Sequence, residues 1–134
     1  MATLADYIVL SDASFEINAS FPTTKDLNFD LNNDFITGTK LAKPILAFII
    51  NPLTTDANVS ITVSSGPVGS EGFPQKQDTI STLRFSGELS HDQGLWEAFS
   101  GKLLTPNEPN TITFEVTAGR VRVRDVVLWY QRRS

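Results

Sequence analysis

Short segments in which apolar and polar side chains alternate recur along this chain, and they constrain the fold more than any other feature of the sequence. Successive side chains of a β-strand point to opposite faces, so this two-residue period predicts strands that bury one face. No segment keeps a helical period long enough to form a helix of ordinary length. The candidate strands are residues 7–10, 15–21, 27–31, 44–52, 58–63, 79–85, 95–104, 110–117 and 120–130.

The number and spacing of these segments indicate the fold class. About nine strands separated by short turns are typical of an antiparallel two-sheet β-sandwich. A parallel sheet would need crossover helices between its strands, and the sequence offers none. The length of 134 residues suffices to bury one hydrophobic core. We therefore expect an all-β chain in which residues 1–134 form a single sandwich domain.

Two stretches depart from the simple alternation. Residues 44–52 are apolar almost throughout and are bracketed by Pro44 and Pro52. Such a run predicts a central strand that is buried on both faces. Residues 64–79 are rich in glycine and proline and have no period, so they predict a long loop, either functional or a tolerated insertion.

The last candidate strand, RVRVRDVVLWY at residues 120–130, changes parity at Asp125. An unbroken alternation would bury the Asp125 carboxylate, which costs several kcal/mol when the group has no partner. A β-bulge adds one residue to a strand and so moves the charge outward. With a bulge at residues 124–125, the side chains that face inward are Val121, Val123, Val126, Leu128 and Tyr130, whereas Arg122, Val127 and Trp129 lie outside.

This final hairpin also carries a resemblance. The segment NTITFEV at residues 110–116, followed by VRVRDVVL at residues 121–128, resembles the C-terminal end of galactose-binding-like jelly rolls. Many carbohydrate-binding modules of this type close on such a strand, with an aspartate at the kink. The resemblance implies a jelly-roll sandwich and permits a sugar-binding role.

Composition excludes several classes of function. The chain has no cysteine, which excludes disulfides, thiolate nucleophiles and cysteine-ligated metals. The net charge of −4 argues against a nucleic-acid-binding surface. The only basic cluster lies between Arg120 and Arg133, and we interpret it as a solvated edge strand. Neither a signal-peptide pattern nor an apolar run of membrane-spanning length is present, so we expect a soluble protein, cytoplasmic by default, with no membrane partner.

The sequence gives little indication of catalysis. His91 is the only histidine, in the turn sequence SHDQG, and its neighbour Asp92 cannot orient it from the adjacent position. No nucleophile elbow, HExxH pattern or phosphate-binding glycine loop occurs. We therefore do not expect an enzyme.

The acidic segment DLNFDLNND at residues 26–34 allows two interpretations. Leu27, Phe29 and Leu31 alternate with polar residues, which predicts a strand followed by a turn. The alternative is a calcium site formed by Asp30, Asn32 and Asp34, because Ca²⁺ prefers converging oxygen ligands. The spacing of an EF-hand loop is not met. No other cofactor is expected.

Two exposed tryptophans carry the functional hypotheses. The parity of residues 95–103 turns Trp96 outward, and the bulge does the same for Trp129; an exposed indole stacks on sugar rings or anchors a protein interface. The first hypothesis is a non-catalytic, lectin-like module that binds carbohydrate. The second is a structural subunit of a virion, tail or similar particle that forms a homo-oligomer. The candidate ligand-binding residues are Trp96, Trp129, Arg122, Phe73 and His91.

Overall fold

The computed structural model describes residues 3–35, 43–68, 74–86 and 91–133. Within them lie nine strands and one 3₁₀ turn. These are β1 (Thr3–Ser11), β2 (Phe15–Asn18), β3 (Thr24–Phe29), β4 (Ile45–Pro52), β5 (Asp56–Val68), β6 (Pro74–Ser86), β7 (Gln93–Ala98), η1 (Gly101–Leu103), β8 (Asn110–Ala118) and β9 (Arg120–Arg133). This part of the chain includes no helix long and apolar enough to cross a membrane.

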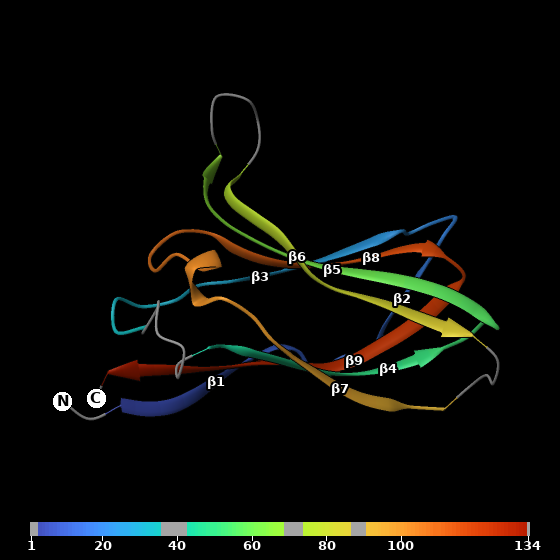
Figure 1. The fold of residues 1–134 in the computed structure, drawn as a ribbon, viewed down its shortest axis with the longest axis horizontal. Helices are drawn as coiled ribbons and strands as arrows, with labels where there is room; N and C mark the ends of the chain where they lie inside the picture. Colours follow the sequence, from blue (N-terminus) through green and yellow to red (C-terminus); the bar gives the residue numbers. More distant parts are fainter. Residues whose placement is uncertain (1–2, 36–42, 69–73, 87–90, 134) are drawn as a thin grey trace.

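The strands form two antiparallel sheets that lie one above the other (Figure 1). The five-stranded sheet has the order β1-β9-β4-β7, with β2 also paired to β9, and the four-stranded sheet has the order β3-β8-β5-β6. The antiparallel sandwich predicted from the sequence is confirmed.

The pairing of the strands is that of a jelly roll. β2 pairs with β9, β3 with β8, β4 with β7 and β5 with β6. This nested series is a long antiparallel hairpin, from β2 to β9, that has been rolled into two layers. β1 adds a further strand along the same edge of β9 as β2, with Thr3 opposite Arg133.

The core lies between the two sheets and consists of aliphatic and phenyl side chains. Phe114 of the four-stranded sheet makes edge contacts with Phe48 and Phe15, with ring centroids 5.3 and 5.9 Å apart. Around it pack fully buried residues of both sheets, including Leu46, Ile50, Ile61, Ile112 and Leu128. Removing this apolar surface from water is the main stabilising term of such a fold.

The predicted bulge in β9 is confirmed. The register between β4 and β9 shifts between Ala47 and Ile49, and Asp125 takes a positive φ of 53°. The side chains of Val121, Val123, Val126 and Leu128 are all 0% exposed, and Tyr130 packs against the core. Asp125 is exposed, so the extra residue keeps its carboxylate in water while the apolar set changes parity.

The prediction that residues 44–52 are buried on both faces is wrong. Along β4, buried residues alternate with partly exposed ones. Leu46, Phe48 and Ile50 point into the core, whereas Ile45, Ala47 and Ile49 lie on the outer face of the five-stranded sheet. No described element covers that face, which therefore remains open to solvent.

Two further expectations need correction. The strand expected over residues 95–104 ends at Ala98, and η1 follows, with the Ser100 hydroxyl accepting a hydrogen bond from the Lys102 N–H at 3.3 Å. Most of the expected loop at residues 64–79 is strand, because β5 continues to Val68 and β6 begins at Pro74. These two ends rise away from the sandwich as paired arms (Figure 1).

Candidate functional site: an exposed apolar sheet face

Two rows of apolar side chains cross the outer face of the five-stranded sheet. In the first row Tyr7, Trp129, Ile45 and Ala98 are direct neighbours on β1, β9, β4 and β7. In the second row the neighbours are Val9, Val127, Ala47 and Trp96. Side chains that are directly opposite on antiparallel strands lie about 5 Å apart, so these eight residues form one continuous surface, here called the apolar face.

The apolar face is open to water to an unusual degree. The exposed fractions are 68% for Trp96, 54% for Tyr7, 51% for Val9 and 45% for Trp129. These are four of the six large hydrophobic residues that are exposed in the described parts of the chain. Scattered exposed apolar residues are ordinary, but a continuous group of them marks an interaction surface.

Two aromatic rings of the apolar face are in contact. The rings of Tyr7 and Trp129 lie 5.0 Å apart between centroids and are tilted by 42°. Trp96 stands on β7, two strands away from Trp129 in the sheet order. Adjacent strands are about 4.8 Å apart and the two residues are one row apart, so their backbone positions are roughly 12 Å apart on the sheet.

A shallow hollow of about 140 Å³ opens at one end of the apolar face. It is lined by Ala5, Lys43, Ile45, Trp129, Tyr130 and Gln131. At the opposite end, Gly94 pairs with Ile49, and a methyl group added to Gly94 would meet no other atom within 4 Å. The face thus has a protruding indole at Trp96, a hollow beside Trp129 and a bare ledge at Gly94.

Charged side chains border the apolar face on the side of β2. Glu16 lies 3.8 Å from the Arg120 guanidinium and 3.7 Å from that of Arg122. Arg124 contacts Asp92 at 2.7 Å and Asp125 at 2.5 Å, and its hydrogen bonds to these two carboxylates raise the pKa of Arg124. These pairs are solvent-exposed, so each contributes little to stability. Together they form a polar rim.

A second charged group fixes the end of β9. Arg132 contacts Asp6 of β1 at 2.9 Å and Asp34, which follows β3, at 3.3 Å. The hydrogen bond from the Tyr7 N–H lowers the pKa of Asp6, and the bond from Arg132 adds to this effect against the opposing influence of desolvation. Burial, with the nearby carboxylates of Asp6 and Asp34, raises the pKa of Tyr130. This group ties three segments together beside the hollow.

The outer face of the four-stranded sheet has the opposite character. Its rows consist of hydroxyl, amide and carboxylate side chains, such as Asp26, Thr113, Thr62 and Thr79 in register. Thr113 donates to Asp26 at 2.7 Å, and the hydroxyls of Thr62 and Thr79 lie 3.3 Å apart. The fold therefore does not require an apolar outer face, and the one on the five-stranded sheet needs a separate explanation.

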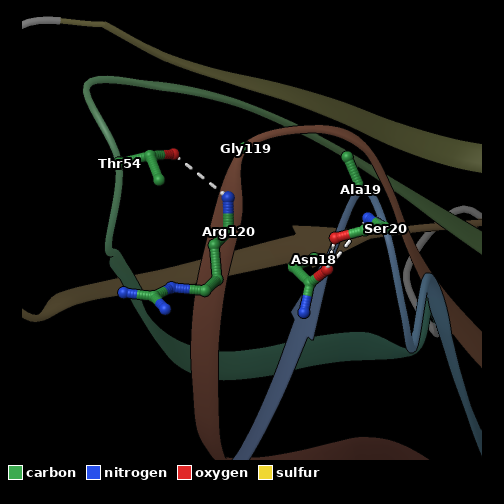
Figure 2. A pocket seen from close by; sticks show the side chains of 6 residues that line it. All are labelled: Asn18, Ala19, Ser20, Thr54, Gly119 and Arg120. Carbon is green, nitrogen blue, oxygen red and sulfur yellow. Dashed lines mark hydrogen bonds between the residues drawn. The ribbon is translucent and has the colours of Figure 1, made fainter.

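A larger hollow, of about 510 Å³, lies at the turn between β8 and β9 (Figure 2). Its polar atoms bond to one another: Asn18 Oδ1 accepts from Ser20 and from the Phe21 N–H at 2.8 Å, and Thr54 accepts from the Arg120 N–H at 3.1 Å. Gly119, with φ of +76°, closes this turn. We interpret the hollow as the surface of well-bonded turns.

The predicted site residues fall into different places. Trp96 and Trp129 belong to the apolar face, and Arg122 to its rim. His91 is exposed and lines another hollow, of about 360 Å³, with neighbours that include Arg84 and Gln93. Phe73 lies outside the described residues.

The calcium alternative receives no support from the arrangement of its residues. Leu27, Phe29 and Leu31 are buried, as the strand interpretation predicts, and Asp30 and Asn32 are exposed. The Asp34 carboxylate contacts Arg132. The described ranges contain no group of three or more histidine, cysteine or acidic residues that could hold a metal ion.

Sequence reasoning missed most of the apolar face. An apolar residue in a strand is ordinarily a core residue, so the sequence does not predict a binding role for Tyr7, Val9, Ile45 or Ala47. The detectable signal was the lack of alternation in residues 44–52 together with the outward parity of Trp96 and Trp129. Read together, these features indicate an apolar layer on both sides of one sheet.

No protein-family model matches this sequence, and no curated protein matches it significantly. Solved structures do resemble it. The VP2 protein of infectious bursal disease virus, in derived T=1 particles, matches with a TM-score of 0.61 and 13% identity over 97% of this chain and 32% of VP2. Dimeric latent PorU from Porphyromonas gingivalis matches with a TM-score of 0.58 and 9% identity over 98% of this chain and 13% of PorU.

A third resemblance is to the CBM22-1-GH10 modules of xylanase 10B from Clostridium thermocellum, complexed with xylohexaose. The TM-score is 0.49, with 13% identity over 94% of this chain and 27% of that one. This chain thus spans a third or less of the length of each of these proteins. At such low sequence identities, the resemblances to VP2 and PorU show a shared fold and nothing about function.

Proposed function

We propose that the chain is a non-catalytic assembly module that associates with further copies of itself through the apolar face. The observation that carries this proposal is the continuity of eight apolar residues across four strands, with no charged residue among them. Aromatic residues are enriched and charged residues are depleted at the centres of protein interfaces, and a polar rim surrounds those centres. The apolar face and its rim have this composition.

The same composition disfavours a glycan as the main ligand. Sugar sites combine a stacking ring with polar groups that converge on the hydroxyls of the ligand. Most of the apolar face is aliphatic, with Val9, Ile45, Ala47 and Val127 between the aromatic rings. Packing between such surfaces is typical of sheets in contact, about 10 Å apart.

Light scattering on the purified chain tests the assembly. We expect an oligomer that Trp129→Lys converts to monomer, because the substitution places a charge within the apolar surface that the copies bury. Thr82→Lys, on the exposed outer face of the four-stranded sheet, is the matched control and should leave the oligomer unchanged. A monomeric wild-type chain at high concentration would overturn the proposal.

Carbohydrate binding is a second candidate function, favoured by one observation at the edge of the apolar face. The Trp96 ring stands two positions from the bare ledge at Gly94, and the Arg124–Asp92 pair lies near the start of β7. A ring, an open ledge and charged hydrogen-bonding groups are the parts of a sugar site. Glycan-array binding by a monomer, lost in Trp96→Ala and in Gly94→Lys, would support this function over assembly.

A further inference from the structure

The apolar face carries both a projection and a recess, and these fit the same kind of partner. The projection is the Trp96 indole, 68% exposed at the β7 edge of the five-stranded sheet. The recess is the hollow beside Trp129, whose lining includes Ala5, Ile45 and Gln131. An aromatic side chain seated in a partly apolar pocket is the usual centre of a strong protein contact.

We propose, on the basis of the assembly function above, that two copies pack face to face about a two-fold axis, and that each Trp96 enters the hollow of the other copy. A two-fold axis brings the same patch of both subunits together. A projection and a recess on that patch therefore form two equivalent contacts. The axis must pass midway between them. Ile45, which forms one wall of the hollow and pairs directly with Ala98, lies close to that midpoint.

The residues near the axis permit close approach. Ala98 and Ala47 are small, and Ala98 is exposed, so the two β4–β7 pairs can approach without removing a large side chain. Beyond Trp96 along β7, Gly94 has no side chain to obstruct a partner. Small residues thus flank Ile45 near the axis, and the two tryptophans stand farther from it, so the facing surfaces can interdigitate.

The dimensions of the face are those of the centre of a dimer interface. Four strands and the rows from the hollow to Gly94 span roughly 15 Å by 20 Å at ordinary strand spacing and rise, which is about 300 Å². A standard interface covers about 800 Å² per partner, including its polar margin. The apolar face supplies the centre of such an interface, and the rim with Arg122 and Arg124 lies where the margin would fall.

Mixing two complementary variants tests the two-fold contact. Trp96→Ala removes the projection and Ala5→Trp fills the hollow, so each variant alone should weaken association by about tenfold or more, as the loss of an interface centre does. An equimolar mixture should regain association, because the intact Trp96 of one variant meets the open hollow of the other. Thr82→Trp, on the opposite sheet, should have no effect. Melting temperatures establish that each variant is folded.

A cross-link tests the position of the axis. The chain has no cysteine, so a single Ala98→Cys substitution gives an unambiguous attachment point between copies. Facing sheets lie about 10 Å apart, beyond the reach of a disulfide, so a short bifunctional maleimide is the suitable cross-linker. It should yield a covalent dimer with Ala98→Cys and not with Thr82→Cys. If Trp129→Lys abolishes association but mixing fails to restore it, or both cysteine variants cross-link equally, the two-fold contact is wrong and the assembly function stands. A chain that is monomeric throughout overturns both.

Discussion

Leu128 and Trp129 are adjacent in the chain and lie on opposite faces of the same sheet. Leu128 is fully buried between the layers, whereas Trp129 rests against Tyr7 on the apolar face. This orientation depends on the bulge at Asp125, because without the extra residue the two side chains would exchange faces. The stabilities of substitutions at the two positions should therefore differ sharply.

Leu128→Ala should destabilise the protein by about 2–5 kcal/mol, the range measured for leucine truncations in cores. Trp129→Ala should cost less, chiefly the contact with Tyr7, which is worth about 0.5–1.5 kcal/mol. Urea unfolding of the two variants, under conditions where the chain is monomeric, measures both values. A larger loss for Trp129→Ala would contradict the observed register.

Gly119→Ala should destabilise the protein by more than about 1 kcal/mol, because its φ of +76° suits glycine and an added Cβ would lie 1.9 Å from the carbonyl oxygen of Asp56. Gly94→Ala is the matched control, since its added Cβ meets nothing within 4 Å. Denaturant midpoints of both variants test the comparison. Equal midpoints would show that the β8–β9 turn can adjust at little cost.

Acid should destabilise the native chain more than an Asp6→Asn variant. The pKa of Asp6 is lowered in the folded state, first by the Tyr7 N–H and then by Arg132, so its carboxylate stabilises the fold above the unfolded pKa of about 3.9. This contribution is lost as the pH falls through the folded pKa. Melting temperatures between about pH 5 and pH 2 should fall more steeply for the native chain than for Asp6→Asn. Asp30→Asn, at an exposed position, serves as control.

Calcium should change the melting temperature little, because Asp34 contacts Arg132 and its two candidate partners are exposed. Binding to the folded state alone would raise apparent stability by mass action. Differential scanning fluorimetry with and without millimolar calcium measures the shift. A rise of several degrees that disappears in Asp30→Asn would instead establish the site at Asp30, Asn32 and Asp34.

The sandwich and the bulge could be predicted because each follows from a local rule. Alternation defines strands, and an aspartate cannot occupy a core position without a partner, so the change of parity at Asp125 requires an extra residue. The antiparallel arrangement follows from the absence of crossover helices. Both rules depend only on residues that are close together in the sequence.

The apolar face could not be predicted in the same way. A continuous apolar run such as that of β4 is the same signal whether its outer side is covered by another layer of the chain or left open. Only the three-dimensional arrangement shows that Ile45 and Ala47 join Tyr7 and Val9, which come from a distant strand. The hollow likewise depends on long-range pairing of Ala5 with Gln131.

The pairing of Thr3 with Arg133 has a practical consequence for anything attached to either end of the described chain. Both ends leave the sheet side by side, and two residues further in, Ala5 and Gln131 line the hollow. A short flexible extension is thereby tethered next to the hollow at an effective concentration in the millimolar range. An affinity tag at either end would therefore act as an intramolecular competitor, and association should be measured after the tag has been cleaved.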